Sequence, residues 1–495
     1  QQANRILQNH LEHLSANQVF NGAILITAAK TGEVVAYVGN SNPSDKLHAN
    51  DVDCVQAARS TGSILKPILY EKCIESALIT PYSLVADIPC QYGQFSPKNY
   101  NKTYDGAVPA NEALSRSLNI PMVKLLNDYG LARFHNDLKN MGFRSVNKSA
   151  AHYGLSLILG GAECSLWELN CFYTKMAKSL SCDTVANINL YNGQAFTNQP
   201  LQMDKACIYA TFEAMTQLNR PDEEGNWKAF ETSKKIAWKT GTSFGHRDAW
   251  AIGVTPDYVV SVWTGNADGE GRSGLVGIKT SAPVLFDLFA ILPATQYWFQ
   301  PPYSHMSRVA LCRESGYRAS EFCEHMDTVL IPAACLHTPS CHYHKSIFTD
   351  KSKTYRVDSD CEDMRNMITG NYLILPPLIE KYYKPNHPAF KTPPAYKSSS
   401  QSLLSEKLMA LVYPKNDSKI LIPVQLDETH GKTIFEATHK NSMTKIYWHI
   451  DDEYIGETAQ IHQLALNPAK GKHILKLIDE DGRSITCKFE VAGDP

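Results

Sequence analysis

The chain has 495 residues, 43% of them hydrophobic and 20% charged, with a formal net charge of −2. That length exceeds what one compact core supports, so we expect two or three domains. This near-neutral net charge does not indicate binding to nucleic acid or to an anionic membrane surface. No apolar run approaches the length of about 18 residues that a transmembrane helix needs.

The first 300 residues mix helical and strand-like patterns. Residues 1–14 are polar and helical in pattern, without a signal-peptide core. Residues 22–40 contain two β-branched runs around a turn, which predicts a hairpin. Residues 67–79 and 111–130 have helical patterns, the latter with a break marked by Pro121, and residues 258–266 predict a strand. Helices grouped apart from paired strands indicate an α+β fold.

The composition and the pattern of apolar residues change after residue 300. Residues 301–402 hold four closely spaced cysteines. From residue 376 they are rich in Pro, Lys and aromatic residues, which is typical of an ordered segment that wraps along a domain and of the linker after it. Residues 403–495 alternate between apolar and polar residues and carry Asp/Gly turns, which predicts a small β-sandwich. Tyr447 and Trp448 could stack on glycan or peptide, but an aromatic pair in a small sandwich more often belongs to the core, where we expect them. We therefore expect three units: 1–300, 301–402 and 403–495.

Ser63 and Lys66 stand three positions apart in "RSTGSILKPILYEKC", at the start of a predicted helix. This spacing places both side chains on one face, one turn apart. A serine hydroxyl is a poor nucleophile unless a base takes its proton. A lysine near pH 7 is such a base only if its pKa falls by roughly three units, or about 4 kcal/mol, through burial or a second cation. The pair predicts an activated serine.

Two further motifs follow in chain order. Ser117 and Asn119 form Ser-x-Asn 54 residues after Ser63, and Lys239 begins a Lys-Thr-Gly triplet 122 residues after Ser117. A serine acyl-transfer site needs a nucleophile with its base, a second proton carrier and a strand edge that holds the substrate. These motifs in this order, with Asp at the position of Leu118, are the signature of class A β-lactamases and penicillin-binding proteins.

Other copies of these short motifs are expected to be structural. They are Ser145/Lys148 and Ser442/Lys445, Ser15/Asn17 and Ser145/Asn147, and the triplet Lys30-Thr31-Gly32. The last lies between the two runs of residues 22–40, so it predicts a hairpin turn. Context separates the functional copies, because Gly62 frees the turn before Ser63 and the triplet at 239–241 follows the apolar "KIAW".

Longer stretches extend the match: "RSTGSILKPILYEKCIE", "SPKNYNKTYDGAVPANEALSRSLNIPMVKLL", "YGLSLILGGAECSLWELNCFYTKMA" and "AWKTGTSFGHRDAWAIGVTPDYVVSVWTGN". With them the chain resembles the transpeptidase half of class A penicillin-binding proteins. It is similar to members in which a cysteine-bearing stretch, a "YLILPPLIEKYYKPNHPAFKTPP" segment and a small β-domain follow. The resemblance implies the penicillin-binding transpeptidase fold, an antiparallel sheet flanked by helices. The glycosyltransferase domain and membrane anchor of that family are not in these residues, so we expect no glycan polymerisation from them.

The resemblance implies a role for each catalytic residue. Ser63 would attack a D-Ala-D-Ala amide and form an acyl-enzyme, with Lys66 as the base. Ser117 would relay the proton to the leaving D-Ala, and Asn119 would hydrogen-bond the amide of the donor peptide. Lys239 would attract the substrate carboxylate and help to keep Lys66 neutral.

The resemblance also implies how the substrate is held. Thr240 and Thr242 would bind its carboxylate through their hydroxyls, while the peptide pairs along the strand that includes Gly241. Backbone N–H groups of Ser63 and Thr242 would form the oxyanion hole, where the loss of one donor typically costs about 2.7–4 kcal/mol. Water or a stem-peptide amine would then resolve the acyl-enzyme.

The expected activity is that of a serine-type D-Ala-D-Ala transpeptidase in peptidoglycan biosynthesis, and hence in cell-wall biogenesis and cell shape. A D,D-carboxypeptidase with the same site and a non-catalytic β-lactam sensor or scaffold stay open as alternatives. A β-lactamase is disfavoured, because Leu166 stands four positions before Asn170, where the Glu-x-x-Leu-Asn pattern of class A enzymes has its deacylating Glu.

The expected partners are stem peptides as donor and amine acceptor, β-lactams, and cell-wall synthesis proteins bound through the C-terminal domain, with no nucleic acid. No cofactor is expected. We expect a periplasmic location, with anchoring to the inner membrane by a segment outside this chain.

Cys312, Cys323, Cys335 and Cys341 crowd together, 11, 12 and 6 positions apart, with His342 and His344 adjacent. A zinc site is conceivable, but the Cys-x-x-Cys knuckles of structural zinc modules are missing. Disulfides suit an exported protein better. We therefore predict the pairs Cys312–Cys323 and Cys335–Cys341, among three possible connectivities and without a metal. Cys54, nine residues before Ser63, is expected to be a buried structural thiol.

Overall fold

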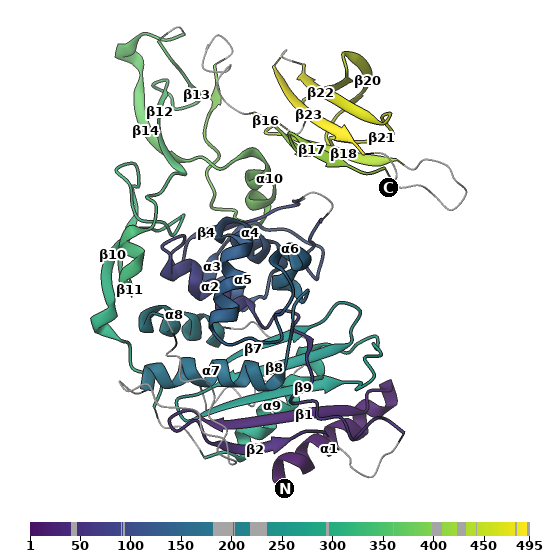
Figure 1. The fold of residues 1–495 in the computed structure, drawn as a ribbon. Helices are drawn as coiled ribbons and strands as arrows, with labels where there is room; N and C mark the ends of the chain where they lie inside the picture. Colours follow the sequence, from purple (N-terminus) through teal and green to yellow (C-terminus); the bar gives the residue numbers. More distant parts are fainter. Residues whose placement is uncertain are drawn as a thin grey trace.

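The computed structural model (Figure 1) describes the chain apart from residues 41–46, 91, 93–94, 182–200, 202, 218–234, 294–296, 360, 398–407, 423–431, 442, 481–482 and 493–495. A five-stranded antiparallel sheet organises its first half, in the order β2-β1-β9-β8-β7. The strands are β1 (Asn21–Ala28), β2 (Val34–Val38), β7 (Ala237–Thr242), β8 (Asp248–Val254) and β9 (Tyr258–Gly265).

Helices cover both faces of this sheet (Figure 1). The helices α1 (Gln2–Leu14) and α9 (Gly277–Ile291) pack on one face, where Leu7, Trp238 and Leu285 belong to one buried cluster. The helix α7 (Leu166–Ser181) packs on the other face against β1 and β9. Because strand residues alternate between faces, Ile24 points to the first layer and Leu25 to the second.

A group of helices lies beyond α7 and carries most of the large core (Figure 1). Its members are α2 (Lys66–Glu75), α3 (Ala110–Ser115), α4 (Asn119–Tyr129), α5 (Leu131–Asn140), α6 (Ala150–Tyr153) and α8 (Lys205–Thr216). Two short antiparallel pairs join it: β3 (Arg59–Ser60) with β6 (Glu163–Cys164), and β4 (Leu84–Asp87) with β5 (Gly106–Pro109). The α+β fold, with its antiparallel sheet flanked by helices, is confirmed.

The break in the helical stretch 111–130 lies earlier than predicted. The helix α3 ends at Ser115 and α4 begins at Asn119, with Ser117 between them at φ 56°. Pro121 instead occupies the first turn of α4, where its missing N–H leaves no intrahelical bond unmade. The shift matters, because it places Ser117 and Asn119 on either side of the point where the chain changes direction.

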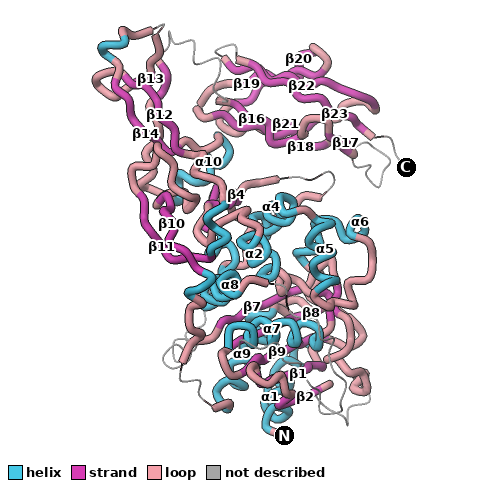
Figure 2. The backbone as a smooth tube through the Cα atoms, turned by 60° about the vertical axis from the view of Figure 1, so that its left-hand side comes forward, coloured by secondary structure: helices cyan, strands magenta, loops and turns pink. Residues whose placement is uncertain are grey.

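The cysteine-bearing extension runs along one side of the helical group (Figures 1 and 2). It contains the hairpin of β10 (Met306–Cys312) and β11 (Met326–Pro332), and a sheet in the order β14-β12-β13-β15. The strands of that sheet are β12 (His344–Thr349), β13 (Tyr355–Arg356), β14 (Ile368–Leu373) and β15 (Ala395–Tyr396). The predicted wrap after residue 376 contains the helix α10 (Pro377–Asn386), since prolines are tolerated in a first helical turn.

The C-terminal part is a two-sheet β-structure, as predicted (Figure 2). One sheet is β16 (Met409–Tyr413), β18 (Thr433–His439) and β21 (Gln463–Leu466). The other is β17 (Ser418–Ile420), β23 (Ser484–Val491), β22 (Gly471–Asp479), β19 (Ile446–Ile450) and β20 (Glu453–Thr458). Trp448 is fully buried in the shared core and donates from Nε1 to Thr458 Oγ1 at 2.8 Å, so its structural role is confirmed. Tyr447 is half-buried.

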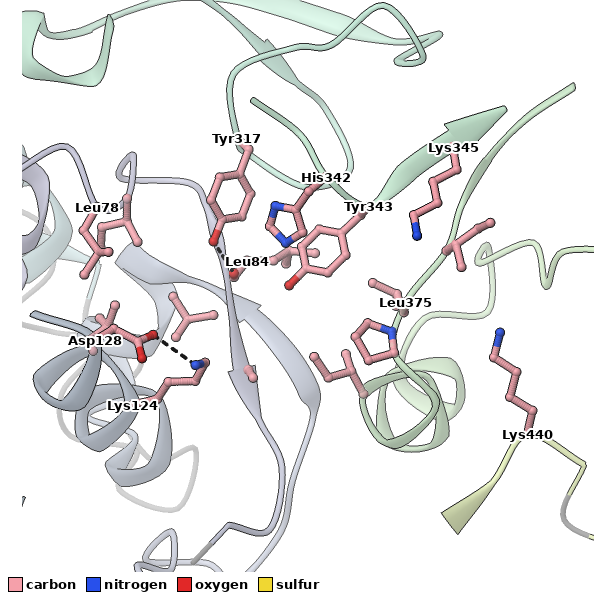
Figure 3. Close-up of a pocket in the computed structure, with 17 residues that line it drawn as sticks. Leu78, Leu84, Lys124, Asp128, Tyr317, His342, Tyr343, Lys345, Leu375 and Lys440 are labelled. Atoms are coloured by element: carbon pink, nitrogen blue, oxygen red, sulfur yellow. Dashed lines mark hydrogen bonds and ion pairs between the residues drawn. The ribbon is translucent and has the colours of Figure 1, made fainter. Parts of the chain in front are cut away.

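A pocket of about 770 Å³ lies where α4, the cysteine-bearing extension and α10 meet (Figure 3). Lys124 and Asp128 of α4 form an ion pair at 3.0 Å on one wall, and Tyr317 donates to the carbonyl of Leu84 at 3.4 Å on another. No residue of the three motifs predicted to be catalytic lines this pocket. Among the described residues, no helix is both long and apolar enough to cross a membrane.

Candidate active site

Ser63 lies in the turn that leads into α2, three residues before Lys66 begins the helix. The turn needs Gly62, whose φ is +52° and where a Cβ would come within 2.5 Å of the backbone nitrogen of Thr242. The Ser63 side chain is half-buried. The backbone of β7 therefore passes directly against the serine turn, as an oxyanion hole made by the N–H groups of Ser63 and Thr242 requires.

Two buried aromatic side chains fix this turn by donating hydrogen bonds to its backbone. Trp250 on β8 donates from Nε1 to the carbonyl of Ser60 at 2.8 Å, and Tyr173 on α7 donates from its hydroxyl to the carbonyl of Ile64 at 3.0 Å. Both bonds fix backbone on either side of the serine, so the position of Ser63 is set by the sheet and by α7 together.

Lys66 is fully buried and its amine reaches the second motif. Nζ lies 2.7 Å from the carbonyl oxygen of Ser117, 3.1 Å from that of Leu118 and 2.7 Å from Oδ1 of Asn119. Burial, and secondly the positive charge of Lys239, hold the pKa of Lys66 well below its usual value. Burial and a second cation are the two influences expected to lower the pKa of a lysine that acts as a base near pH 7.

Lys239 joins the second motif to the third. Its Nζ donates to Oγ of Ser117 at 2.7 Å and to the carbonyl of Thr240 at 2.8 Å, and the side chain is fully buried. Burial lowers the pKa of Lys239 to about 7. Ser117 has a left-handed backbone, which is costly for a residue with a Cβ and is concentrated at functional sites.

The strand β7 packs on the serine turn through Gly241. A Cβ at this position would come within 2.6 Å of the carbonyl oxygen of Thr61, so a larger residue would push the strand away from Ser63. Thr240 and Thr242 are half-buried and lie on the opposite face of β7 from Lys239, by strand alternation. Oγ1 of Thr242 accepts from the N–H of Gly277 at 3.0 Å, at the positive end of α9.

Asn99 supports the site and had not been predicted. Its Oδ1 accepts from the backbone N–H of Asn119 at 3.0 Å and of Ile120 at 3.2 Å, which caps the start of α4 from outside the helix. Its Nδ2 donates to Oδ1 of the buried Asp87 at 2.7 Å. The cap is distant in sequence and matches no capping pattern before Asn119, so no local signal revealed it.

The duplicated motifs lie elsewhere. Lys30 pairs with Asp257 at 2.8 Å, and Thr31 accepts from the N–H of Glu33 at 3.2 Å in the turn between β1 and β2, so the hairpin prediction is confirmed. Lys148 is exposed in the loop after α5. Ser442 lies outside the described residues.

The region that would hold a deacylating glutamate is filled by core residues. Leu166 is fully buried at the start of α7. Asn170 is buried in a polar network, where its Nδ2 donates to Oγ of Ser261 at 2.9 Å. Glu168 accepts from the backbone N–H groups of Ser145 and Ser165 at 2.9 and 3.0 Å, so its carboxylate holds two backbone segments.

The predicted disulfides are wrong. Cys312, Cys323, Cys335 and Cys341 are all free in the structure. Cys335 points into the large core, where burial raises the pKa of its thiol to about 12. Its place beside the other three sulfurs is taken by His344. Cys54 is buried and its pKa is raised to about 11, mainly by burial, as expected of a structural thiol.

Comparison with known families agrees with this geometry. Residues 22–285 match the penicillin binding protein transpeptidase domain, and residues 399–489 match the Penicillin-Binding Protein C-terminus Family. The first match contains all three motifs that were predicted to be catalytic. The second covers the C-terminal β-structure.

Individual relatives point the same way. Penicillin-binding protein 1C of Escherichia coli is 34% identical over 294 residues, which are 58% of this chain and 37% of that protein. Penicillin-binding protein 1B of Haemophilus influenzae is 27% identical over 292 residues, or 55% of this chain and 36% of that protein. The chain thus spans little more than a third of these relatives. The crystal structure of penicillin-binding protein 1A from Haemophilus influenzae shares the fold, with a TM-score of 0.51, 18% identity and coverage of 65% of this chain and 54% of that one.

Proposed function

Because the chain belongs to the penicillin-binding protein transpeptidase domain family, we propose that it is a peptidoglycan D,D-transpeptidase that cross-links stem peptides through a serine acyl-enzyme. The observation that carries this proposal is the pair of fully buried lysines beside the serine turn. One amine contacts Asn119 and the other contacts Ser117, so the three motifs form one hydrogen-bonded unit.

In the proposed acylation, each side chain of the three motifs has one role. Neutral Lys66 takes the proton of Ser63 as Oγ attacks the carbonyl of the penultimate D-Ala. The developing oxyanion accepts from the N–H groups of Ser63 and Thr242. Ser117 gives its proton to the departing D-Ala nitrogen and regains one from the protonated Lys66, while Lys239 beside it holds the terminal carboxylate. An amine of a neighbouring stem peptide then attacks the acyl-enzyme and loses its proton to Lys66. The ester bond to Ser63 breaks, Ser63 takes that proton back, and the cross-link is formed.

This proposal places the reaction outside the cytoplasm, in the periplasm, where its peptidoglycan substrate lies. The C-terminal β-structure is proposed to contact cell-wall synthesis partners. Slow hydrolysis of the acyl-enzyme is proposed as well, since Leu166 and Asn170 are core residues and Glu168 already binds two backbone N–H groups.

The products of the reaction test this function. The chain is incubated with uncross-linked peptidoglycan strands that carry pentapeptide stems, and the muropeptides are separated after digestion. We expect cross-linked dimers that disappear when benzylpenicillin is added. Trimmed tetrapeptide monomers alone would instead make the protein a D,D-carboxypeptidase, and unchanged pentapeptides would reject both activities.

Acylation by a carboxylate-bearing β-lactam is expected to slow as the pH rises through about 7, the pKa of Lys239. Burial lowers this pKa, so the amine loses the charge that holds the carboxylate at neutral rather than alkaline pH. The second-order rate constant reports the pKa values of the free enzyme and is the quantity to measure. A neutral ester substrate is the control, because it has no carboxylate and should lack this alkaline limb.

The same comparison applies to the variant Lys239→Ala. It should lose more of its rate with the carboxylate-bearing lactam than with the neutral ester. Equal losses for both substrates would mean that Lys239 acts on Lys66 and Ser117 without anchoring a carboxylate.

Because β7 is the edge strand of its sheet, the proposal has the Thr240 hydroxyl reach the substrate carboxylate from the strand edge, on the face opposite Lys239. Thr240→Ala is therefore expected to slow β-lactam acylation roughly ten- to a hundredfold, because one charge-assisted hydrogen bond to that carboxylate is worth about 1.5–3 kcal/mol. Thr31→Ala is the matched control in the other Lys-Thr-Gly triplet. It removes contacts with Glu33 in an exposed turn, worth on the order of 1 kcal/mol of stability, and should leave acylation unchanged. A slow Thr31 variant, or two variants at the wild-type rate, would reject the chosen triplet.

A further inference from the structure

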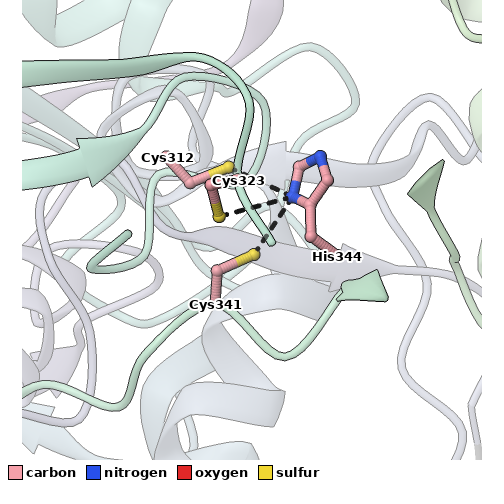
Figure 4. A group of neighbouring side chains, drawn as sticks. All are labelled: Cys312, Cys323, Cys341 and His344. Atoms are coloured by element: carbon pink, nitrogen blue, oxygen red, sulfur yellow. Dashed lines mark hydrogen bonds between the residues drawn. The ribbon is translucent and has the colours of Figure 1, made fainter. Parts of the chain in front are cut away.

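Three cysteines and one histidine of the extension converge on one buried point (Figure 4). They are Cys312, Cys323, Cys341 and His344, and their ligand atoms all lie within 4.8 Å of one another. All four side chains are buried. We propose that this group is a structural zinc site with three thiolate ligands and one imidazole ligand.

The distances fit a tetrahedral zinc ion. Nδ1 of His344 lies 3.4 Å from Sγ of Cys312, 3.7 Å from that of Cys323 and 3.4 Å from that of Cys341. Zinc binds thiolate sulfur at about 2.3 Å and imidazole nitrogen at about 2.0–2.1 Å, so tetrahedral angles separate the two ligand atoms by about 3.6 Å. Nδ1 thus faces all three sulfurs across a gap of the size that one zinc ion fills.

The groups around the ligands suit a metal as well. Nε2 of His344 lies 2.6 Å from Oε2 of Glu314, the carboxylate contact that fixes the ring of a zinc-bound histidine and leaves Nδ1 free to bind. Backbone N–H groups point at two of the sulfurs: that of Ser315 at Cys312, at 3.4 Å, and that of Ser320 at Cys323, at 3.3 Å. Such donors stabilise thiolates, which zinc requires.

The sulfur of Cys341 also has a hydrogen-bond donor. In addition, three cysteines cannot form two disulfides. Oγ of Ser315 donates to Sγ of Cys341 at 3.1 Å. The sulfur needed for two bridges, that of Cys335, is in the large core instead of beside this group. A single bridge would use two of the three sulfurs and leave the third thiol buried beside it, whereas one zinc ion uses all three.

The ligands come from separate pieces of the extension. Cys312 ends β10, Cys323 lies in the loop between β10 and β11, and His344 begins β12. A metal here would fasten the β10–β11 hairpin to the β14-β12 sheet. The surrounding core is small and joins Leu84 of β4 to Tyr383 of α10, so a metal would add a strong link between pieces that share few other buried contacts.

The site also bears on the pocket of Figure 3. Tyr317, His342 and Tyr343, which line that pocket, lie between the ligands in the sequence, and the ring centroids of Tyr317 and His342 are 5.1 Å apart. Loss of the metal should therefore loosen this wall. It should leave Ser63 and the two buried lysines in place, because no ligand contacts them.

Elemental analysis of the whole chain, purified without chelator, tests the proposal. We expect one zinc ion per chain, reduced to background in Cys341→Ser and retained in Cys335→Ser, the matched cysteine outside the group. Because Cys341→Ser could fail to fold, His344→Cys is the second variant and should keep zinc through four thiolates. Replacement by cobalt should give the absorption of a tetrahedral ion with three thiolate ligands.

Thiol mapping under denaturing, non-reducing conditions distinguishes the alternatives. We expect Cys312, Cys323 and Cys341 to react as free thiols once zinc is removed. A disulfide between any two of them together with no bound metal would overturn the proposal, and so would a zinc content that Cys335→Ser loses and Cys341→Ser keeps.

Discussion

Ser63→Ala is expected to abolish covalent labelling by a fluorescent penicillin while the thermal unfolding curve stays close to that of the wild type. Only the half-buried hydroxyl is removed, and the turn is held by backbone contacts to Trp250 and Tyr173 that the change leaves intact. Without the nucleophile no ester can form. Labelling is read on a denaturing gel after a fixed exposure.

Ser145→Ala is the matched control for that experiment. Ser145 has the same Ser-x-x-Lys spacing, but its Lys148 is exposed in a loop. The control should label like the wild type. Persistent labelling of the Ser63 variant would show that another residue is acylated.

Lys66→Ala is expected to slow acylation by about 10²–10⁴-fold, the range that a positioned general base contributes. Raising the pH should restore little of this rate, because the base itself is gone. Lys66→Arg should be equally slow, since a guanidinium keeps its proton at any accessible pH. The measurement is the second-order rate of β-lactam acylation across a pH series.

The control for Lys66 is Lys148→Ala, which should acylate at the wild-type rate. Removing Lys66 also leaves the carbonyls of Ser117 and Leu118 without the amine, so thermal unfolding must be measured on the same sample. A folded Lys66→Ala protein that regains the full rate at high pH would show that hydroxide replaces the lysine and that Lys66 is not the base.

Local pattern was enough to predict much of the site. The i, i+3 spacing of Ser63 and Lys66, the order of the motifs and the apolar residues before Lys239 indicated which copies to choose. The structure brings Lys66 to Asn119 and Lys239 to Ser117, although 122 residues separate the latter pair. The hairpin turn at Thr31 was predictable because turn and strand patterns are local.

Features that depend on packing between distant segments were not predictable. Asn99 caps α4 from a loop that precedes α3, and the left-handed backbone of Ser117 shifts the helix break away from Pro121. The proposed metal site was considered from the sequence but set aside in favour of disulfides, for a similar reason. Cys341-x-x-His344 has the spacing of a zinc knuckle, but its other two ligands come from a hairpin whose position only the fold determines.

The central claim is that Ser63 is the residue that carries the acyl group. Mass spectrometry of the intact chain after exposure to benzylpenicillin, followed by peptide mapping, tests it most directly. The account predicts one added benzylpenicillin per chain, located on Ser63 in the tryptic peptide "STGSILKPILYEK" and still present after removal of free drug. An acyl group on any other residue, or none on a folded chain, would contradict it.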